Sequence, residues 1–291
     1  MKNFDFRNAK TLKSAIKILD ELQENALLVA GGTNVMVDIR AEKVNNRTLV
    51  NIRDIAELKG IHFRHGEVSI GAMTTIAEMS VSNTLKKHAP ALFGAACVFA
   101  DPSTNRLATI GGNVGNASAS GDTIPPLMVL DATVHLVSAQ GERQVNIFDF
   151  IVKNGVTTRK PNEIITKITF KSQPKTGFIK LGPRKSMCIS IATAAAYVDV
   201  DKSGIVNDCR IAMGGVAGVT VRGKHAEKAL MGKKLADDIW EKVGEEVQKD
   251  ISPRDPSVRA AASYRRAVVP VLVKRAVNLA AFGECMGEVK K

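Results

Sequence analysis

The chain has 291 residues, of which 45% are hydrophobic, so it can bury the core of one large domain or of two ordinary ones. Its formal net charge is +12, but lysine and arginine are dispersed, aromatic residues make up only 4%, and zinc-finger and RNP-like motifs are absent. This pattern disfavours nucleic-acid binding and indicates a solvated surface or an acidic partner or ligand. No apolar run is long enough to span a bilayer, and the first residues lack the apolar stretch of a secretory signal, so we expect a cytoplasmic protein.

The four cysteines lie far apart, and none belongs to a CxxC or Cys/His group; they are Cys97, Cys188, Cys209 and Cys285. Ligands of zinc and of iron–sulfur clusters usually come in tight local groups. We therefore expect no metal site and no cluster held by this chain alone.

The expected elements of the first half follow from hydrophobic spacing, beginning with a helix that Thr11 caps and that extends to Leu22. A short buried strand at residues 27–30 runs directly into Gly31-Gly32-Thr33-Asn34. The remaining elements are strands at 49–52 and 68–70, a short helix at 74–79 and a longer helix at 83–99, which Asp101-Pro102 ends.

The stretch from Thr109 to Asp122 is built from small and polar residues, and we expect it to be a loop because glycine and asparagine weaken strand interiors. Its Gly111-Gly112 pair allows backbone N–H groups to approach an anion closely. The stretch adds polar side chains at Asn113, Ser118, Ser120 and Asp122.

Two Gly-Gly motifs in one domain suggest a ligand whose extended diphosphate is held from two sides. A strand followed by a small-residue turn and polar caps suits phosphate binding. Neither motif has the GxGxxG or GxxxxGK[ST] spacing, which excludes the Rossmann and P-loop interpretations. The alternative for each motif is a glycine-rich surface loop without a ligand.

The second half begins with a hairpin at 133–137 and 143–145, turning at Gln140-Gly141. A helix at 148–152 and a strand at 163–170 follow, and the polar residues 171–177 mark a domain boundary. Beyond it we expect an α+β module: three antiparallel strands at 178–181, 189–200 and 205–213, then helices at 223–231, 236–249 and 257–282, the last broken or bent at Pro270.

With these motifs in order, the chain resembles the FAD-binding subunit of the molybdenum hydroxylases, the family of xanthine and carbon monoxide dehydrogenases. Within it, the medium subunit of bacterial xanthine dehydrogenases is most similar, and nicotinate dehydrogenase flavin subunits are nearly as similar. The resemblance covers nearly the whole chain and includes residues 50–58, 184–190, 212–217 and 255–265. It implies an α+β fold: a FAD-binding domain of two subdomains, of the PCMH or vanillyl-alcohol-oxidase type, at 1–174, then a small domain like the CO dehydrogenase flavoprotein C-terminal domain, with a three-stranded antiparallel sheet and helices, at 175–291.

The resemblance also implies the residues that would contact FAD. The first motif would wrap the diphosphate, the second would bind it from the other side, Asp122 would hold ribityl or ribose hydroxyls, an aromatic residue would lie near the adenine, and one aliphatic residue would lie beside the isoalloxazine ring. The implied set is Leu28, Val29, Ala30, Gly31, Gly32, Thr33, Asn34, Phe99, Thr109, Gly111, Gly112, Asn113, Asp122, Lys185 and Ile189. Phe99 could instead be a core residue, and Lys185 one of a solvated pair with Arg184.

The sequence departs from the family at residues 102–106, where Asn105-Arg106 inverts the usual Arg-Asn order, and at Asn34, where aspartate or serine is common. No cysteine-bearing insertion that would add a cluster is present.

No nucleophile–base pair or carboxylate dyad stands out, which fits a chain whose chemistry belongs to a cofactor. Neither Gly-Gly motif contains histidine or cysteine, so FAD should be non-covalent. By resemblance, a partner subunit carries molybdopterin, another carries 2Fe-2S clusters, and the external electron acceptor is NAD or another molecule. The alternatives are the FAD subunit of a nicotinate or other heterocycle or aldehyde hydroxylase, a stand-alone flavin reductase of the same wider fold, and a non-enzymatic nucleotide-binding protein.

Overall fold

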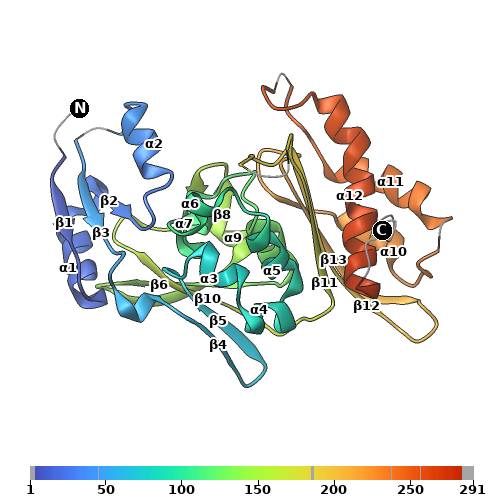
Figure 1. Cartoon of the computed structure of the whole chain (residues 1–291), viewed down its shortest axis with the longest axis horizontal. Coiled ribbons are helices and arrows are strands. Elements are labelled where there is room, and N and C mark those ends of the chain that lie inside the picture. The colour runs from blue at the N-terminus through green and yellow to red at the C-terminus, as the bar shows by residue number, and fades with distance from the viewer. Residues whose placement is uncertain (1–3, 45, 185–186, 237, 256, 284–291) are drawn as a thin grey trace.

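The structure is a computed structural model that describes residues 4–44, 46–184, 187–236, 238–255 and 257–283. Its N-terminal part is a parallel sheet of strands in the order β1-β3-β2, with α1 packed on it (Figure 1). The elements of this part are β1 (Phe6–Asn8), α1 (Leu12–Leu22), the 3-10 turn η1 (Gln23–Asn25), β2 (Ala26–Val29), α2 (Val35–Arg40), β3 (Thr48–Asn51) and η2 (Ala56–Leu58). The predicted Thr11 cap is confirmed, since its side chain accepts a hydrogen bond from the N–H of Ser14.

A second, antiparallel sheet follows, with its strands in the order β4-β5-β10-β6-β7. These strands are β4 (Ile61–Arg64), β5 (Glu67–Gly71), β6 (Thr133–Ser138), β7 (Gly141–Asn146) and β10 (Ile164–Lys171). The hairpin predicted at 133–137 and 143–145 is confirmed, since β6 and β7 pair in antiparallel fashion. The small sheet of β8 (Ile151–Lys153) and β9 (Val156–Thr157) lies near α7.

Short helices fill the space between this sheet and the C-terminal sheet, and their apolar side chains form one core with both. They are α3 (Ile76–Ser80), α4 (Asn83–His88), α5 (Pro90–Cys97), α6 (Pro102–Asn105), α7 (Ile110–Asn116), α8 (Ile124–Val129) and α9 (Ile147–Phe150). Contacts of α5 and α8 with the C-terminal strands join the two halves of the chain.

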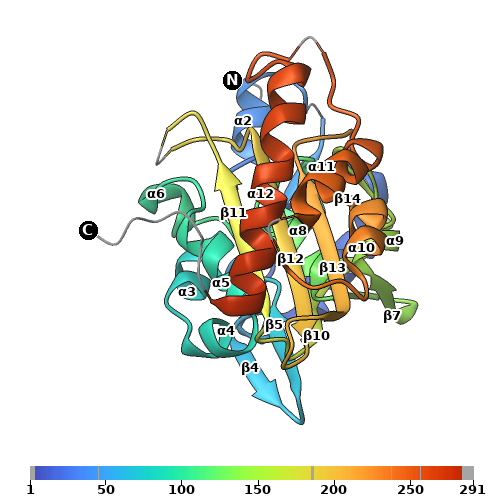
Figure 2. The same cartoon turned by 90° about the vertical axis from the view of Figure 1, so that its right-hand side faces the viewer.

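The C-terminal part is an antiparallel sheet of strands in the order β11-β12-β13-β14, with helices on its outer face. Figure 2 shows the long helix α12 lying across β11 and β12. The elements are β11 (Thr176–Leu181), β12 (Ala192–Val200), β13 (Val206–Gly214), β14 (Val221–Arg222), α10 (Lys224–Leu230), α11 (Ile239–Asp250) and α12 (Ala262–Phe282). The sheet expected to have three strands has four. The fourth strand, β14, was not predicted because its two residues are too few to show a hydrophobic pattern.

Several other expectations differ from the structure. The helix expected at 83–99 is divided into α4 and α5, because Pro90 cannot donate the backbone hydrogen bond that a continuous helix needs. The helix expected from residue 257 begins at Ala262, and it is unbroken at Pro270. The stretch expected to be a loop contains helix α7. Among the described residues, no helix is long and apolar enough to cross a membrane.

Candidate functional site

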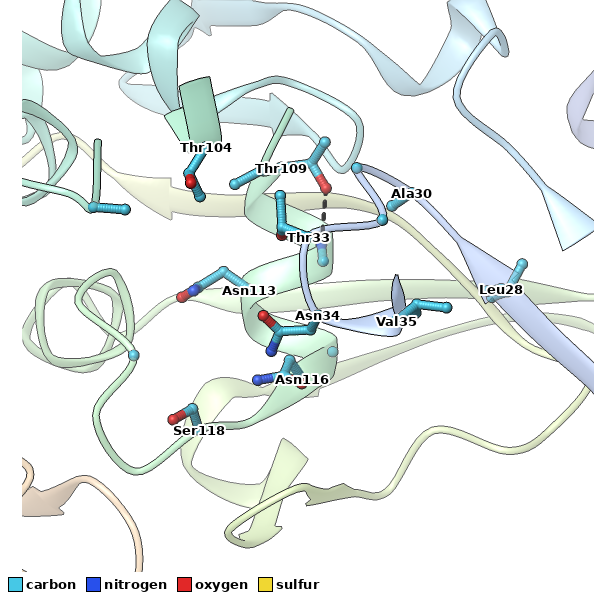
Figure 3. Close-up of a pocket in the computed structure, with 18 of the residues that line it drawn as sticks. Leu28, Ala30, Thr33, Asn34, Val35, Thr104, Thr109, Asn113, Asn116 and Ser118 are labelled. Atoms are coloured by element: carbon cyan, nitrogen blue, oxygen red, sulfur yellow. Dashed lines mark hydrogen bonds between the residues drawn. The ribbon is translucent and has the colours of Figure 1, made fainter. Parts of the chain in front are cut away.

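A cavity of about 530 Å³ lies where β2 and the loop after it meet helix α7, and it has the size of an ordinary ligand pocket. Figure 3 shows both elements contributing side chains to it. The C-terminal part supplies further wall residues, Cys188, Ile189 and Arg259. The cavity therefore brings together segments that are far apart in the sequence.

The first Gly-Gly motif forms a tight turn against the segment that precedes α7. A Cβ on Gly31 would lie 1.8 Å from the carbonyl oxygen of Leu107, so only glycine allows this approach. Gly32 has a φ of +73°, a conformation that glycine adopts without strain. Within the described residues, the backbone N–H groups of residues 31–35 donate to no protein acceptor. Such a run of free donors suits an anion.

The second motif forms the first turn of helix α7, and its N–H groups all have acceptors in the protein. The N–H of Ile110 donates to the carbonyl of Thr74 at 3.1 Å, and that of Gly111 to the carbonyl of Ala72 at 2.8 Å. Thr109 caps the helix by accepting from the N–H of Gly112 at 3.1 Å. The expectation that these N–H groups would face a ligand is therefore wrong for residues 110–112, and α7 must contact a ligand through its surface and side chains.

The cavity-facing surface of α7 is small at Gly112 and polar at Asn113 and Asn116. The buried hydroxyl of Thr123 donates to Oδ1 of Asn113 at 2.7 Å. This bond leaves the Asn113 amide nitrogen to donate elsewhere. Figure 3 shows the amide side chains of Asn34, Asn113 and Asn116 in the cavity that they line. Free backbone donors on one wall thus face amide groups on the other.

Asp122 lines the cavity but is already engaged by protein groups. Its Oδ2 accepts from Nζ of Lys180 at 2.7 Å, and its Oδ1 accepts a short hydrogen bond from the hydroxyl of Ser190. Burial raises the pKa of the Asp122 carboxyl above its ordinary value, against the lowering effects of Lys180 and Ser190. Any ligand hydroxyl that contacts Asp122 would therefore share this carboxylate with Lys180 and Ser190.

Most of the site residues expected from the resemblance line this cavity. They are Leu28, Ala30, Gly31, Gly32, Thr33, Asn34, Phe99, Thr109, Gly111, Gly112, Asn113, Asp122 and Ile189. Val29 does not line it; its carbonyl accepts a hydrogen bond from the N–H of Ile52 at 3.1 Å. Lys185 lies outside the described residues. Phe99 lines the cavity and also packs against the core, and its contact with an adenine stays a prediction.

Two arginines in the cavity wall, Arg159 and Arg259, are outside the predicted set of site residues. Arg159 donates to the carbonyl oxygens of Lys160 and Glu163, and burial lowers the pKa of its guanidinium. No sequence signal placed Arg159 here, because its loop precedes β10 and is remote from both Gly-Gly motifs. Arg259 stands in the 255–265 stretch that carried the resemblance, but no site role was predicted for it.

Comparison with known proteins explains this geometry. Residues 2–170 match the family described as the FAD binding domain in molybdopterin dehydrogenase, and residues 178–280 match the CO dehydrogenase flavoprotein C-terminal domain. The xanthine dehydrogenase FAD-binding subunit of Escherichia coli O157:H7 is 32% identical over 283 residues, which are 94% of this chain and 96% of that protein. The chain belongs to the FAD-binding subunit family of the molybdenum hydroxylases.

Other proteins similar to this chain are named for different substrates. The nicotinate dehydrogenase FAD-subunit of Eubacterium barkeri is 30% identical, over 83% of this chain and 84% of that protein. A carbon monoxide dehydrogenase structure from Hydrogenophaga pseudoflava superposes with a TM-score of 0.91 at 28% identity, covering 98% of this chain and 99% of that chain. The family resemblance and the α+β fold expected from the sequence are therefore confirmed.

The cavity fits the cofactor of this family. The free N–H groups of residues 31–35 suit a diphosphate, the amide groups of α7 suit hydroxyls or phosphate oxygens, and Gly112 leaves room where a side chain would fill the space. In the described residues, no group of histidine, cysteine or acidic side chains is arranged to hold a metal ion.

Proposed function

We propose that this chain holds a non-covalent FAD in the cavity and acts as the electron-transfer subunit of a multi-subunit molybdenum hydroxylase. Electrons would come from 2Fe-2S clusters on a small subunit, after oxidation of substrate on a molybdopterin-containing large subunit, and would leave to NAD or another acceptor. The observation that carries this proposal is the run of unpaired N–H groups at residues 31–35 opposite the amide-bearing face of α7, in a chain of this family.

The chain's own residues would bind and orient the cofactor rather than move protons. The N–H groups of the first motif would hold the diphosphate, and the Asn113 amide, oriented by Thr123, would donate from the opposite wall. Ile189 would lie beside the isoalloxazine ring and Phe99 near the adenine. Bound FAD supplies the chemistry, by accepting electrons one or two at a time.

We further propose that 1–174 forms the cofactor-binding domain and that 175–291 closes over it. For the substrate of the whole complex we propose xanthine, because the xanthine dehydrogenase subunit is 32% identical over 94% of this chain. Nicotinate is the alternative, because the nicotinate dehydrogenase subunit is 30% identical over 83% of this chain.

The experiment that tests this function is reconstitution with the iron–sulfur and molybdenum chains from the same organism. The isolated chain should show at most slow NADH-to-dye turnover and should hydroxylate neither xanthine nor nicotinate. The reconstituted complex should pass electrons from one of these substrates to an acceptor, and omission of this chain should stop that transfer. Hydroxylation of either substrate by the isolated chain would overturn the proposal.

A further inference from the structure

The ammonium group of Lys180 joins three segments at the edge of the cavity. Lys180 lies on β11, and its side chain is only 8% exposed. Its Nζ donates to Oδ2 of Asp122 at 2.7 Å, to the carbonyl of Val98 at 3.1 Å and to the carbonyl of Cys188 at 3.3 Å. A lysine ammonium has three N–H donors, so these partners use all of them.

Each partner of Lys180 belongs to the cavity wall or adjoins it, whereas Lys180 itself does not line the cavity. Asp122 and Cys188 are wall residues, and Val98 directly precedes the wall residue Phe99. Lys180 is therefore joined to the cavity wall through its partners.

The segment 187–190 is tied to the first half of the chain by further bonds around this ammonium. The N–H of Met187 donates to the carbonyl of Ala100 at 3.0 Å, and the hydroxyl of Ser190 donates to Asp122. Met187 and Ala100 both have positive φ values, of 54° and 38°, which non-glycine residues adopt only where their surroundings hold them. This segment supplies Cys188 and Ile189 to the cavity, so its position sets one wall.

We infer that Lys180 is a positioning residue whose buried ammonium fastens the segment 187–190 against Val98 and Asp122 and thereby sets how firmly the cavity retains its ligand. The link to FAD rests on the proposed function. The fastening itself rests on the bonds of Lys180 and on those of Met187 and Ser190 beside it, and it does not depend on the identity of the ligand. Because Asp122 is buried with this ammonium, loss of Lys180 also leaves a carboxylate without its cation.

The test compares Lys180→Met with Lys180→Arg, which keeps the charge and the donors, and with Lys175→Met as a matched control. Lys175 pairs with Asp199 at 2.6 Å, but the side chains of that pair are 47% and 37% exposed. The first readout is the alkylation rate of Cys188 in FAD-free protein, followed by mass spectrometry of its peptide. Lys180→Met should label Cys188 at least about tenfold faster than the unmodified protein, because the segment opens when its buried pair is lost. Lys180→Arg should restore much of the protection, and Lys175→Met should label as the unmodified protein does.

The second readout is the FAD dissociation constant, which should rise at least about tenfold in Lys180→Met. Ser190→Ala removes one hydrogen bond and keeps the test valid should Lys180→Met fail to fold. It should raise the Cys188 alkylation rate and the FAD dissociation constant severalfold. Unchanged Cys188 labelling in Lys180→Met and Ser190→Ala would overturn the inference, whatever happens to FAD. Faster labelling in a protein that never binds FAD would support the fastening and overturn the proposed function.

Discussion

At the scale of single residues, the two glycines of the second motif have different roles. A Cβ on Gly111 would lie 2.6 Å from Cβ and 2.7 Å from the carbonyl oxygen of Ala72, so this glycine allows α7 to pack against the end of β5. Gly112 is exposed at the cavity, and a Cβ there would meet only the Thr109 hydroxyl, at 2.9 Å, and the Ala30 methyl, at 3.7 Å. One glycine serves packing and the other leaves space for a ligand.

We therefore predict that Gly111→Ala lowers the free energy of unfolding by about 1–3 kcal/mol, the usual range for overpacking. Gly112→Val should abolish FAD binding, because its branches would enter the cavity, and should lower the free energy of unfolding by about 1 kcal/mol, the typical value of an N-cap, because its Cβ meets the Thr109 hydroxyl. Chemical denaturation and titration of apo-protein with FAD measure the two effects. Gly94→Val is the control, since a Cβ on Gly94 meets nothing within 4 Å and Gly94 does not line the cavity. A Gly112→Val protein that binds FAD stoichiometrically would refute the role given to Gly112.

The Asn113 amide depends on a second residue for its orientation. Thr123→Val keeps the shape of this fully buried side chain but removes the hydroxyl that bonds Asn113. We expect FAD binding to weaken by about 1 kcal/mol, roughly fivefold, with the fold retained. Asn113→Ala should weaken it further. Calorimetric titration checks both, and an unchanged dissociation constant in Asn113→Ala would show that the amide does not contact the cofactor.

At the scale of elements, α7 shows what sequence patterns can and cannot predict. Its composition predicted a loop, yet Thr109 caps it and the carbonyls of Ala72 and Thr74 accept its first N–H groups. The capping threonine was visible in the sequence, but the acceptors come from a segment more than thirty residues earlier, so only the tertiary structure reveals them. Helix α1, by contrast, was predicted correctly because its cap and its apolar spacing are both local.

These two helices provide a matched pair of cap substitutions. Thr109→Ala and Thr11→Ala should each lower the free energy of unfolding by about 1 kcal/mol, the typical value of an N-cap. Only Thr109→Ala should also weaken FAD binding, because α7 lines the cavity and α1 does not. Equal FAD dissociation constants for the two variants would contradict the role of α7 as a cavity wall.

The link between β7 and the start of β10 is an ion pair with a defined pH dependence. Nε of Arg143 donates to Oε1 of the buried Glu163 at 2.5 Å and Nη2 donates to Oε2 at 2.7 Å, while the N–H of Lys160 adds a third bond. Burial works to raise the pKa of Glu163, but these hydrogen bonds outweigh it and the pKa is lowered. A lowered pKa stabilises the folded state above the unfolded-state value of about 4.3, and this stability is lost as pH falls through the folded-state value.

Glu163→Gln should therefore lower the free energy of unfolding by about 1–3 kcal/mol at pH 7, the range for a bond to a charged group. The difference in free energy of unfolding between the variant and the unmodified protein should shrink as the pH falls below about 4. Denaturant unfolding at pH 7, 5 and 3.5 measures it. A difference that stays constant over this range would show that the charge of Glu163 contributes nothing.

At the scale of the whole molecule, the order of the motifs along the chain predicted the family, the α+β fold and the two Gly-Gly motifs of the cavity wall. It did not predict Arg159, which reaches the cavity from a polar loop, or the bonds by which Lys180 joins β11 to Asp122. Lys180 lies within an expected strand and has no motif around it. Contacts between distant segments such as these follow from the packing of the two halves of the chain, which no local pattern encodes.

The central claim is that this chain holds FAD, non-covalently, in the cavity between the first Gly-Gly motif and α7. The most direct measurement is acid precipitation of the purified protein, with the released flavin identified by chromatography and its amount compared with that of the chain. We predict one FAD per chain, all of it in the supernatant, and none bound to the Gly112→Val variant. Flavin that stays in the pellet, FMN as the only species, or stoichiometric FAD in the Gly112→Val protein would contradict the account.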